Sequence, residues 1–544
     1  MRLKRLAPLL ATAGLVATTV PLLAATQASA ASASDYLRQK PAWQRCSTEQ
    51  PASYECATLK VPLDYRRPQG RTIDLAISRI KSENPAKRHG AMLFNPGGPG
   101  GSGLGLPLEM NGAMPKDVRD QYDLIGFDPR GVGASSPITC GLTEAEQNID
   151  RPYRPETYPS DVQWARTVAD KCREKSGDVL AHITTRNTAR DMDTIRAVLG
   201  ERKISFIGYS YGTYLGAVYS QMFPERTDRF VLDSGVDPKR IWRGMIQVWA
   251  SEAEPAYKRW TEWAAQRSAE FHLGDTPQAV SDTFWGLVAR ADREPIELYG
   301  QKLTGDDIRT ARGAFFYPAQ VTPLIVDLKA SAEGAPRPAA AAGTPVPDVK
   351  KLLAGDRSPG RSAMGGPAAR TGAAGAEQAA DNGTAVFLAV ICGDTGAWPR
   401  YTEQYERDAA KDKARYPLYG DFASNIKPCA FWDRPVEAAT PMRTRADVLT
   451  VQNEWDSQTP LVSGQGLHKA LKGSRMVLAA GGEGHGVYLV DPASCVNAPV
   501  NSYLTTGRLP HEDITCQNPA PGTERREGLT SPKPLPLPSA PDRF

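Results

Sequence analysis

Four apolar segments in the first half of the chain have the pattern of core β-strands. Residues 91–95 (AMLFN), 122–128 (YDLIGFD), 204–210 (ISFIGYS) and 229–236 (RFVLDSGV) are short, nearly continuous apolar runs. Strands that are buried on both faces have such runs, whereas a half-exposed strand alternates apolar and polar residues. Residues 72–80 (TIDLAISRI) alternate in this way. The pattern therefore predicts one half-exposed strand followed by four core strands.

A helix is predicted between two of these strands. Residues 188–200 (TARDMDTIRAVLG) carry Met192, Ile195 and Val198 at helical spacing, and Gly200 can cap the end of the helix. Because strands and helices alternate along the chain, we expect an α/β fold with a mostly parallel sheet flanked by helices.

The middle of the chain, residues 237–385, has a different character. It opens with a helical segment rich in Trp, residues 240–266, and residues 331–380 contain 29 Ala, Gly or Pro in 50 positions. Such a composition buries little core and predicts a loop or linker. The strand pattern then returns at 446–456 and 474–485, each ending at a polar residue. We therefore expect a large helical insertion within the sheet domain.

The N-terminus has the three parts of a secretory signal. Residues 1–30 begin with basic side chains, continue with small and apolar residues and end in Ala-Ser-Ala, so cleavage is expected after Ala30. A membrane anchor is the alternative, but Pro8 and Pro21 interrupt the apolar run. We expect a secreted, extracellular protein without a membrane anchor. The chain ends in a Pro-rich tail at residues 517–544.

Composition narrows the possible functions. The 544 residues are 41% hydrophobic and 23% charged, which is typical of a globular protein and not of a disordered or coiled-coil chain. The 65 basic and 61 acidic side chains nearly balance. With no basic patch, nucleic acid is not an expected partner.

Eight cysteines, all after the leader, predict disulfides in an exported chain. Sequential pairing needs only short local loops, and the expected pairs are Cys46–Cys56, Cys140–Cys172, Cys392–Cys429 and Cys495–Cys516. The chain has neither a CxxC pair nor an HExxH motif, so we expect no metal and no cofactor.

The strongest chemical signal is the GYSYG motif of residues 208–212, which lies between a predicted strand and a predicted helix. In a nucleophile elbow, a serine lies on a sharp strand-to-helix turn, and flanking glycines permit close backbone approach. A GxSxG pattern alone is weak, but this strand and helix context is the one such an elbow requires. The motif predicts Ser210 as a catalytic nucleophile.

A glycine-rich segment, residues 95–103 (NPGGPGGSG), follows the strand at 91–95. A tetrahedral intermediate of acyl transfer needs preorganised N–H donors for its oxyanion, and glycine lets the backbone aim them. We expect the N–H groups of Gly98 and Tyr211 to form this oxyanion hole. A flexible turn is the simpler alternative, and a phosphate loop is disfavoured because GKS and GKT are absent.

A nucleophilic serine needs an imidazole base and an orienting carboxylate, which follow it in the chain order Ser, Asp, His. His485 lies in a glycine-rich loop after the last predicted strand, and Asp456 ends the strand before it. Asp394 is a rival for the acid, and Asp233 is a third choice because it ends the strand after the elbow. The other histidines lie outside these strand ends or in polar segments; they are His89, His182, His272, His468 and His511.

Taken together, these motifs resemble one family. The segments are VPLDY (61–65), NPGGPGGSG (95–103), GFDPRGVGAS (126–135), GYSYGTYLG (208–216) and GEGHG (482–486). They resemble the secreted tripeptidyl aminopeptidases of actinomycetes, which are α/β-hydrolases related to proline iminopeptidases. The resemblance implies an α/β-hydrolase core formed by residues 31–236 and 386–516, with residues 237–385 inserted as a helical lid.

The resemblance also implies an activity. It implies a serine exopeptidase that releases short peptides, tripeptides in this family, from free N-termini through an acyl-enzyme. The same fold and triad serve esterases, so a secreted carboxylesterase is the alternative. A non-catalytic binding protein is disfavoured because every element of the triad is present.

An enzyme that acts on free N-termini needs a group that recognises a cationic α-amine. A partly desolvated carboxylate on the lid can do so, since it faces the nucleophile across the cleft. Glu252 and Glu254 lie in the lid segment beside Trp249 and are our candidates. Ordinary solvated acids at a helix end are the alternative interpretation.

Overall fold

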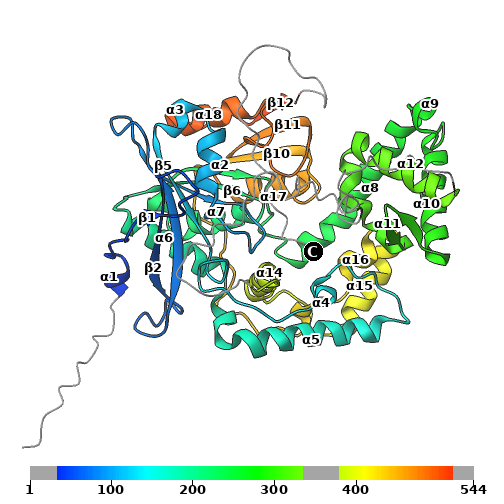
Figure 1. Cartoon of the computed structure of the whole chain (residues 1–544), viewed down its shortest axis with the longest axis horizontal. Helices are drawn as coiled ribbons and strands as arrows, with labels where there is room; N and C mark the ends of the chain where they lie inside the picture. The colour runs from blue at the N-terminus through cyan, green and yellow to red at the C-terminus, as the bar shows by residue number, and fades with distance from the viewer. Residues whose placement is uncertain (1–32, 335–348, 350–378, 519–544) are drawn as a thin grey trace, which may run out of the picture.

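The computed structural model of the chain describes residues 33–334, 349 and 379–518 (Figure 1). The predicted leader 1–30, nearly all of the Ala/Gly/Pro-rich segment 331–380 and nearly all of the tail 517–544 lie outside these ranges. No helix among the described residues is long and apolar enough to cross a bilayer.

A single large sheet organises the molecule. Its ten strands lie in the order β1-β2-β3-β5-β4-β6-β7-β10-β11-β12. The strands are β1 (Gln44–Arg45), β2 (Tyr54–Pro62), β3 (Thr72–Ile80), β4 (Gly90–Asn95), β5 (Tyr122–Phe127), β6 (Ile204–Tyr209), β7 (Thr227–Asp233), β10 (Leu449–Trp455), β11 (Arg475–Glu483) and β12 (Ile514–Gln517). All pairs from β5 to β12 are parallel, and β1, β2 and β3 form an antiparallel edge. The mostly parallel sheet is therefore confirmed.

The central strands lie where their sequences predict. Every residue of β4 and β6 is buried, because helices cover both faces of the sheet at this point. The alternating segment 72–80 is β3, which pairs with β2 over nine residues in an antiparallel hairpin. β2 was not predicted from the sequence.

Helices cover the sheet on both faces. One face packs against α6 (Thr185–Val198), α7 (Tyr211–Met222) and α17 (Leu461–Ala470), and the other against α2 (Leu106–Ala113), α3 (Lys116–Arg119) and α18 (Asn497–Thr506). The long helix α5 (Tyr158–Ser176) lies further from the strands and contacts the 3-10 turns Gly177–His182 and Pro428–Ala430. Shorter elements are α1 (Ala33–Tyr36), α4 (Glu144–Gln147) and the 3-10 turns Gly177–His182, Pro224–Arg226 and Pro428–Ala430. These layers make an α/β/α sandwich.

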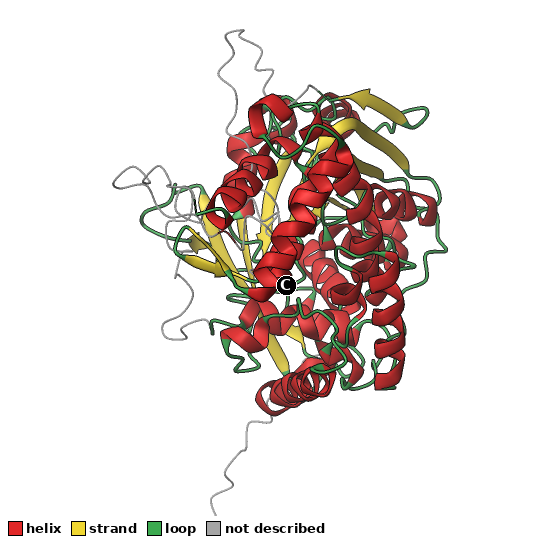
Figure 2. Ribbon diagram, turned by 90° about the vertical axis from the view of Figure 1, so that its right-hand side faces the viewer, coloured by secondary structure: helices red, strands yellow, loops and turns green. Residues whose placement is uncertain are grey.

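Between β7 and β10 the chain leaves the sheet and forms a helical lobe. Its elements are α8 (Arg243–Ala265), α9 (Ser268–Phe271), α10 (Pro277–Arg293), β8 (Ile296–Leu298), β9 (Gln301–Leu303), α11 (Gly305–Arg309), the 3-10 turn Thr310–Phe316 and α12 (Pro318–Ala332). The lobe has a core of its own, in which Trp260, Phe284 and Phe315 pack against one another. Figures 1 and 2 show these helices gathered at one side of the sheet.

Three more helices among the described residues precede β10, namely α14 (Asn382–Gly393), α15 (Thr402–Arg415) and α16 (Gly420–Ser424). α14 packs in the main core, whereas α16 contacts α8 of the helical lobe. These helices therefore link the lobe to the sheet domain. All four disulfides join sequential cysteines, Cys46–Cys56, Cys140–Cys172, Cys392–Cys429 and Cys495–Cys516, which confirms the expected pairing.

Candidate active site

Ser210 lies on the sharp turn between β6 and α7. Its backbone has φ 54° and ψ −122°, a conformation that L-residues rarely adopt and that occurs at functional sites. The two glycines of the motif permit this turn. A Cβ on Gly208 would lie 2.4 Å from the carbonyl oxygen of Gly212, and one on Gly212 would lie 2.9 Å from that of Asn95. The GxSxG pattern is thus required by backbone packing around the serine.

The glycine-rich loop after β4 lies directly against this turn. A Cβ on Gly97 would lie 2.9 Å from the Cβ of Ser210. Gly98 and Tyr211 both line the cavity that contains Ser210. Neither the N–H of Gly98 nor that of Tyr211 donates a hydrogen bond to another residue in the described ranges. Both donors are therefore free for a group that enters the cavity.

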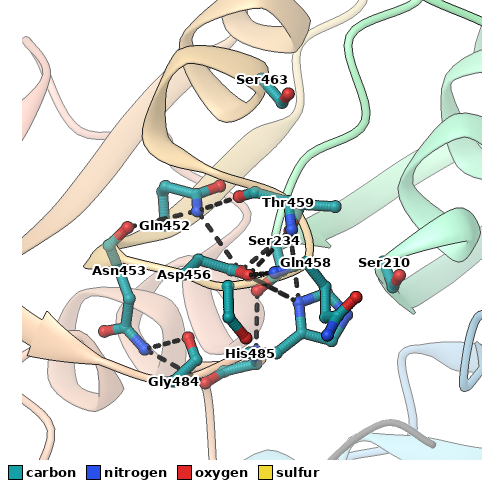
Figure 3. Close-up of polar contacts among 12 residues, drawn as sticks. Ser210, Ser234, Gln452, Asn453, Asp456, Gln458, Thr459, Ser463, Gly484 and His485 are labelled. Carbon is teal, nitrogen blue, oxygen red and sulfur yellow. Dashed lines mark hydrogen bonds and ion pairs between the residues drawn. The ribbon is translucent and has the colours of Figure 1, made fainter. Parts of the chain in front are cut away.

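His485 and Asp456 meet at the same end of the sheet. They follow the neighbouring parallel strands β11 and β10, whose carboxyl ends lie at one edge. The Nδ1 atom of His485 is 2.9 Å from Oδ1 of Asp456 and 3.1 Å from Oδ2. Figure 3 shows the imidazole between the Asp456 carboxylate and the Ser210 side chain. The structure thus brings together the three residues that the sequence singles out.

Several donors hold the Asp456 carboxylate in its charged form. The N–H groups of Gln458 and Thr459 donate to Oδ1 at 2.8 and 2.9 Å, and the Thr459 hydroxyl donates to Oδ2 at 2.9 Å. Burial by itself would raise the pKa of Asp456, but the adjacent His485 and these N–H donors lower it below its ordinary value. An acid that stays ionised can orient an imidazole and stabilise its protonated form.

The cavity around Ser210 and His485 is mostly apolar. Its apolar walls come from the segment after β7, from α8 and from α14, and consist of Val236, Trp242, Met245, Ile246, Trp249, Phe387 and Ile391. The helical lobe and the sheet domain therefore both contribute to it. Such a cavity can exclude water from a reacting carbonyl and accept an uncharged side chain.

The carboxylates of the other two candidate acids have other partners. Asp394 accepts hydrogen bonds from the N–H and hydroxyl of Thr185 and from Nε1 of Trp242, and burial raises its pKa to about 6. Asp233 accepts the backbone N–H groups of Val487 and Tyr488. Neither carboxylate hydrogen-bonds to a histidine in the described part of the chain.

Two of the remaining described histidines have side-chain partners away from Ser210. His468 contacts Ser474 and Asp513, and His89 contacts Asp228. None of the other five histidines lines the cavity of Ser210.

Glu252 and Glu254 lie on α8, within two turns of Trp249. Both are half-buried, and burial raises the pKa of each carboxyl. The Oε1 atom of Glu254 accepts the N–H of Leu418 at 3.1 Å, and Oε1 of Glu252 accepts the hydroxyl of Ser251 at 3.4 Å. Neither glutamate lines the cavity around Ser210.

Two polar residues at the site were not singled out from the sequence. The hydroxyl of Thr459 lies 3.3 Å from Nδ1 of His485 in addition to its contact with Asp456. The side-chain amide of Asn453 donates to the carbonyls of Gly484 and Gly486, on either side of His485 (Figure 3). The only sequence signal for Thr459 is that a polar residue lies three positions after a candidate acid.

Two family models match parts of the chain. Residues 90–312 match a family described as the alpha/beta hydrolase fold, and residues 416–516 match one described as TAP-like protein.

Three relatives align with most of the chain. A tripeptidyl aminopeptidase of Streptomyces lividans is 35% identical over 87% of this chain and 86% of its own. A serine protease Hip1 of Mycobacterium bovis is 28% identical over 88% of this chain and 91% of its own. A carboxylesterase B of Mycobacterium tuberculosis is 29% identical over 92% of this chain and 95% of its own. By the extent of the first of these matches, the chain belongs to the tripeptidyl aminopeptidase family of α/β hydrolases.

Proposed function

We propose that this protein is a secreted serine exopeptidase that releases tripeptides from free N-termini through an acyl-enzyme. The observation that carries the proposal is the contact of His485 with Asp456 beside Ser210, in a cavity shared by the sheet domain and the helical lobe. Membership in the tripeptidyl aminopeptidase family supports the peptide substrate. Four disulfides support an oxidising, extracellular location.

Each residue of the site has a role in this reaction. The hydroxyl oxygen of Ser210 attacks the carbonyl carbon of the third residue of the peptide while its proton passes to Nε2 of His485. Asp456 keeps Nδ1 of the ring protonated and stabilises the imidazolium. The oxyanion accepts hydrogen bonds from the N–H groups of Gly98 and Tyr211.

Collapse of this intermediate breaks the peptide bond. The His485 imidazolium gives its proton to the leaving amine, and the tripeptide remains as an ester on Ser210. A water molecule, deprotonated by His485, then attacks the ester and releases the tripeptide with a free carboxylate.

The helical lobe, from α8 (Arg243–Ala265) to α12 (Pro318–Ala332), acts in this proposal as the lid. Trp249 of α8 lines the cavity from the lobe side. A lid of this kind limits how much peptide can extend beyond the nucleophile. A carboxylate on it, Glu252 or Glu254, would meet the α-ammonium group at the end of the substrate.

Three substrates test the proposal. The purified protein is offered a tripeptide anilide with a free amine, the same anilide with a blocked amine, and a nitrophenyl ester. An aminopeptidase cleaves the free anilide far faster than the blocked one. Cleavage of the ester alone would favour a carboxylesterase, the second candidate, which the likeness to carboxylesterase B supports. Equal cleavage of both anilides would contradict recognition of the free N-terminus.

A further inference from the structure

Asp233 is a fully buried carboxylate at the end of β7, the strand between β6 and β10 in the sheet. β6 leads into Ser210, and β10 leads into Asp456. The carbonyl oxygen of Asp233 accepts the N–H of Ser210 at 2.9 Å. The backbone of this residue is therefore bonded directly to the elbow that presents the nucleophile.

The side chain of Asp233 is bonded to a different part of the site. Its carboxylate accepts the N–H of Val487 at 3.1 Å from each oxygen and the N–H of Tyr488 at 2.7 Å. These two residues follow His485 by two and three positions.

Ser234 completes this contact with the histidine loop. Its hydroxyl accepts the N–H of Gly486 at 2.8 Å and donates to Oδ1 of Asp233 at 3.0 Å (Figure 3 shows Ser234 beside this loop). Three consecutive N–H groups after His485 are thus held by Asp233, the last residue of β7, and by Ser234, which follows it.

Burial of the Asp233 carboxylate near a second carboxylate destabilises its charged form. Two carboxylates, Asp233 and Asp456, are buried at the same end of the sheet, and burial together with the Asp456 charge raises the pKa of Asp233 to about 7. The charged and polar groups around Asp233 are Asp456, Ser234 and the hydroxyl of Tyr209, which donates to the carbonyl of Tyr488. A buried carboxylate in such a place is expected where its position serves the site.

We infer that Asp233 is a positioning residue for the proposed reaction, which fixes the His485 loop relative to the Ser210 elbow. It does not orient the imidazole itself, because Asp456 contacts Nδ1. Its carbonyl oxygen is hydrogen-bonded to the elbow, and its carboxylate is hydrogen-bonded to the histidine loop. Loss of the hydrogen bonds to the carboxylate lets His485 move relative to Ser210, and a displacement of about 1 Å can lower the rate about a hundredfold.

The test compares Asp233→Asn and Ser234→Ala with a matched control, Asp381→Asn. Asp381 is also a buried carboxylate that accepts two backbone N–H groups, of Cys140 and Leu142, and the hydroxyl of Thr139. Its bonds join α14 to another loop and not to the histidine loop. Measured quantities are kcat and KM on the tripeptide anilide, the melting temperature, and the rate at which a fluorophosphonate labels Ser210.

We expect Asp233→Asn to lower kcat and the labelling rate at least tenfold with KM within about twofold. Ser234→Ala should lower both rates by a smaller factor, and Asp381→Asn should leave both unchanged. If Asp233→Asn does not fold, Ser234→Ala decides the question. Rates within twofold of the parent in folded variants, or losses in all three that follow the melting temperature, would overturn the inference.

The inference rests on the proposed function, but the two can fail separately. Because labelling by fluorophosphonate needs an activated serine and no peptide, a parent enzyme that is labelled but cleaves no peptide contradicts only the proposed substrate. In that case the labelling rates of the variants still decide the role of Asp233.

Discussion

The indole N–H of Trp249 donates a hydrogen bond of 2.6 Å to the carbonyl oxygen of Gln458. Trp249 belongs to α8 of the helical lobe, and Gln458 lies two residues after Asp456. Both line the cavity around Ser210. This bond joins the proposed lid to the loop that holds the proposed catalytic acid.

Replacing Trp249 by Phe removes this hydrogen bond and keeps an aromatic wall. A neutral hydrogen bond contributes about 1 kcal/mol, so we expect kcat/KM for the tripeptide anilide to fall about fivefold. Steady-state kinetics beside the nitrophenyl ester measures the effect. An unchanged kcat/KM would mean that the bond does not hold the lid in its active position.

The acid is tested by a pair of substitutions. Asp456→Asn should lower kcat by about a thousandfold or more, since an amide cannot hold the imidazole in the required tautomer. Asp394→Asn, which alters a buried carboxylate without a histidine partner, should lower it far less. The reverse order would transfer the role of the acid to Asp394.

The buried Asp394 carboxyl predicts how the stability of the protein changes with pH. Burial raises its pKa from 3.8 to about 6, so the folded protein binds a proton more tightly here than the unfolded chain does. The contribution of Asp394 to the free energy of unfolding therefore decreases as pH rises from about 4 to about 6, and then levels off. Asn does not titrate. We expect the melting temperature of Asp394→Asn, relative to the parent, to increase between pH 4 and pH 7, as calorimetry can measure.

The amine-binding proposal concerns Glu252 and Glu254. Removing a charge-assisted hydrogen bond to the substrate ammonium should raise KM for the free tripeptide anilide about tenfold and leave kcat nearly unchanged. Glu252→Gln and Glu254→Gln are measured separately, and the nitrophenyl ester is the control because it has no amine. If neither substitution raises KM for the anilide more than KM for the ester, another group of the lid recognises the amine.

Local signals in the sequence accounted for the core of the molecule. The segment 72–80 forms β3 over the same residues, because alternation marks a strand with one face on the core. Ser210 could be singled out because its glycines, its strand and its helix are all adjacent in sequence. His485 and Asp456 could be found because each follows its own strand.

The rest depends on residues that are distant in sequence. Asp233 and Val487 are 254 positions apart, and no local pattern indicates that one accepts a hydrogen bond from the other. β2 was not predicted from the sequence, although it pairs with β3 along its whole length. The contact between Trp249 and Gln458 likewise exists only once the helical lobe has packed on the sheet domain.

The role of Ser210 as the nucleophile is best tested by removing its hydroxyl. Ser210→Ala is compared with the parent on the free tripeptide anilide, with circular dichroism and the melting temperature as controls for folding. We expect a folded protein whose kcat has fallen by several powers of ten, as for loss of other triad serines. A folded Ser210→Ala protein with near-parent turnover would contradict it.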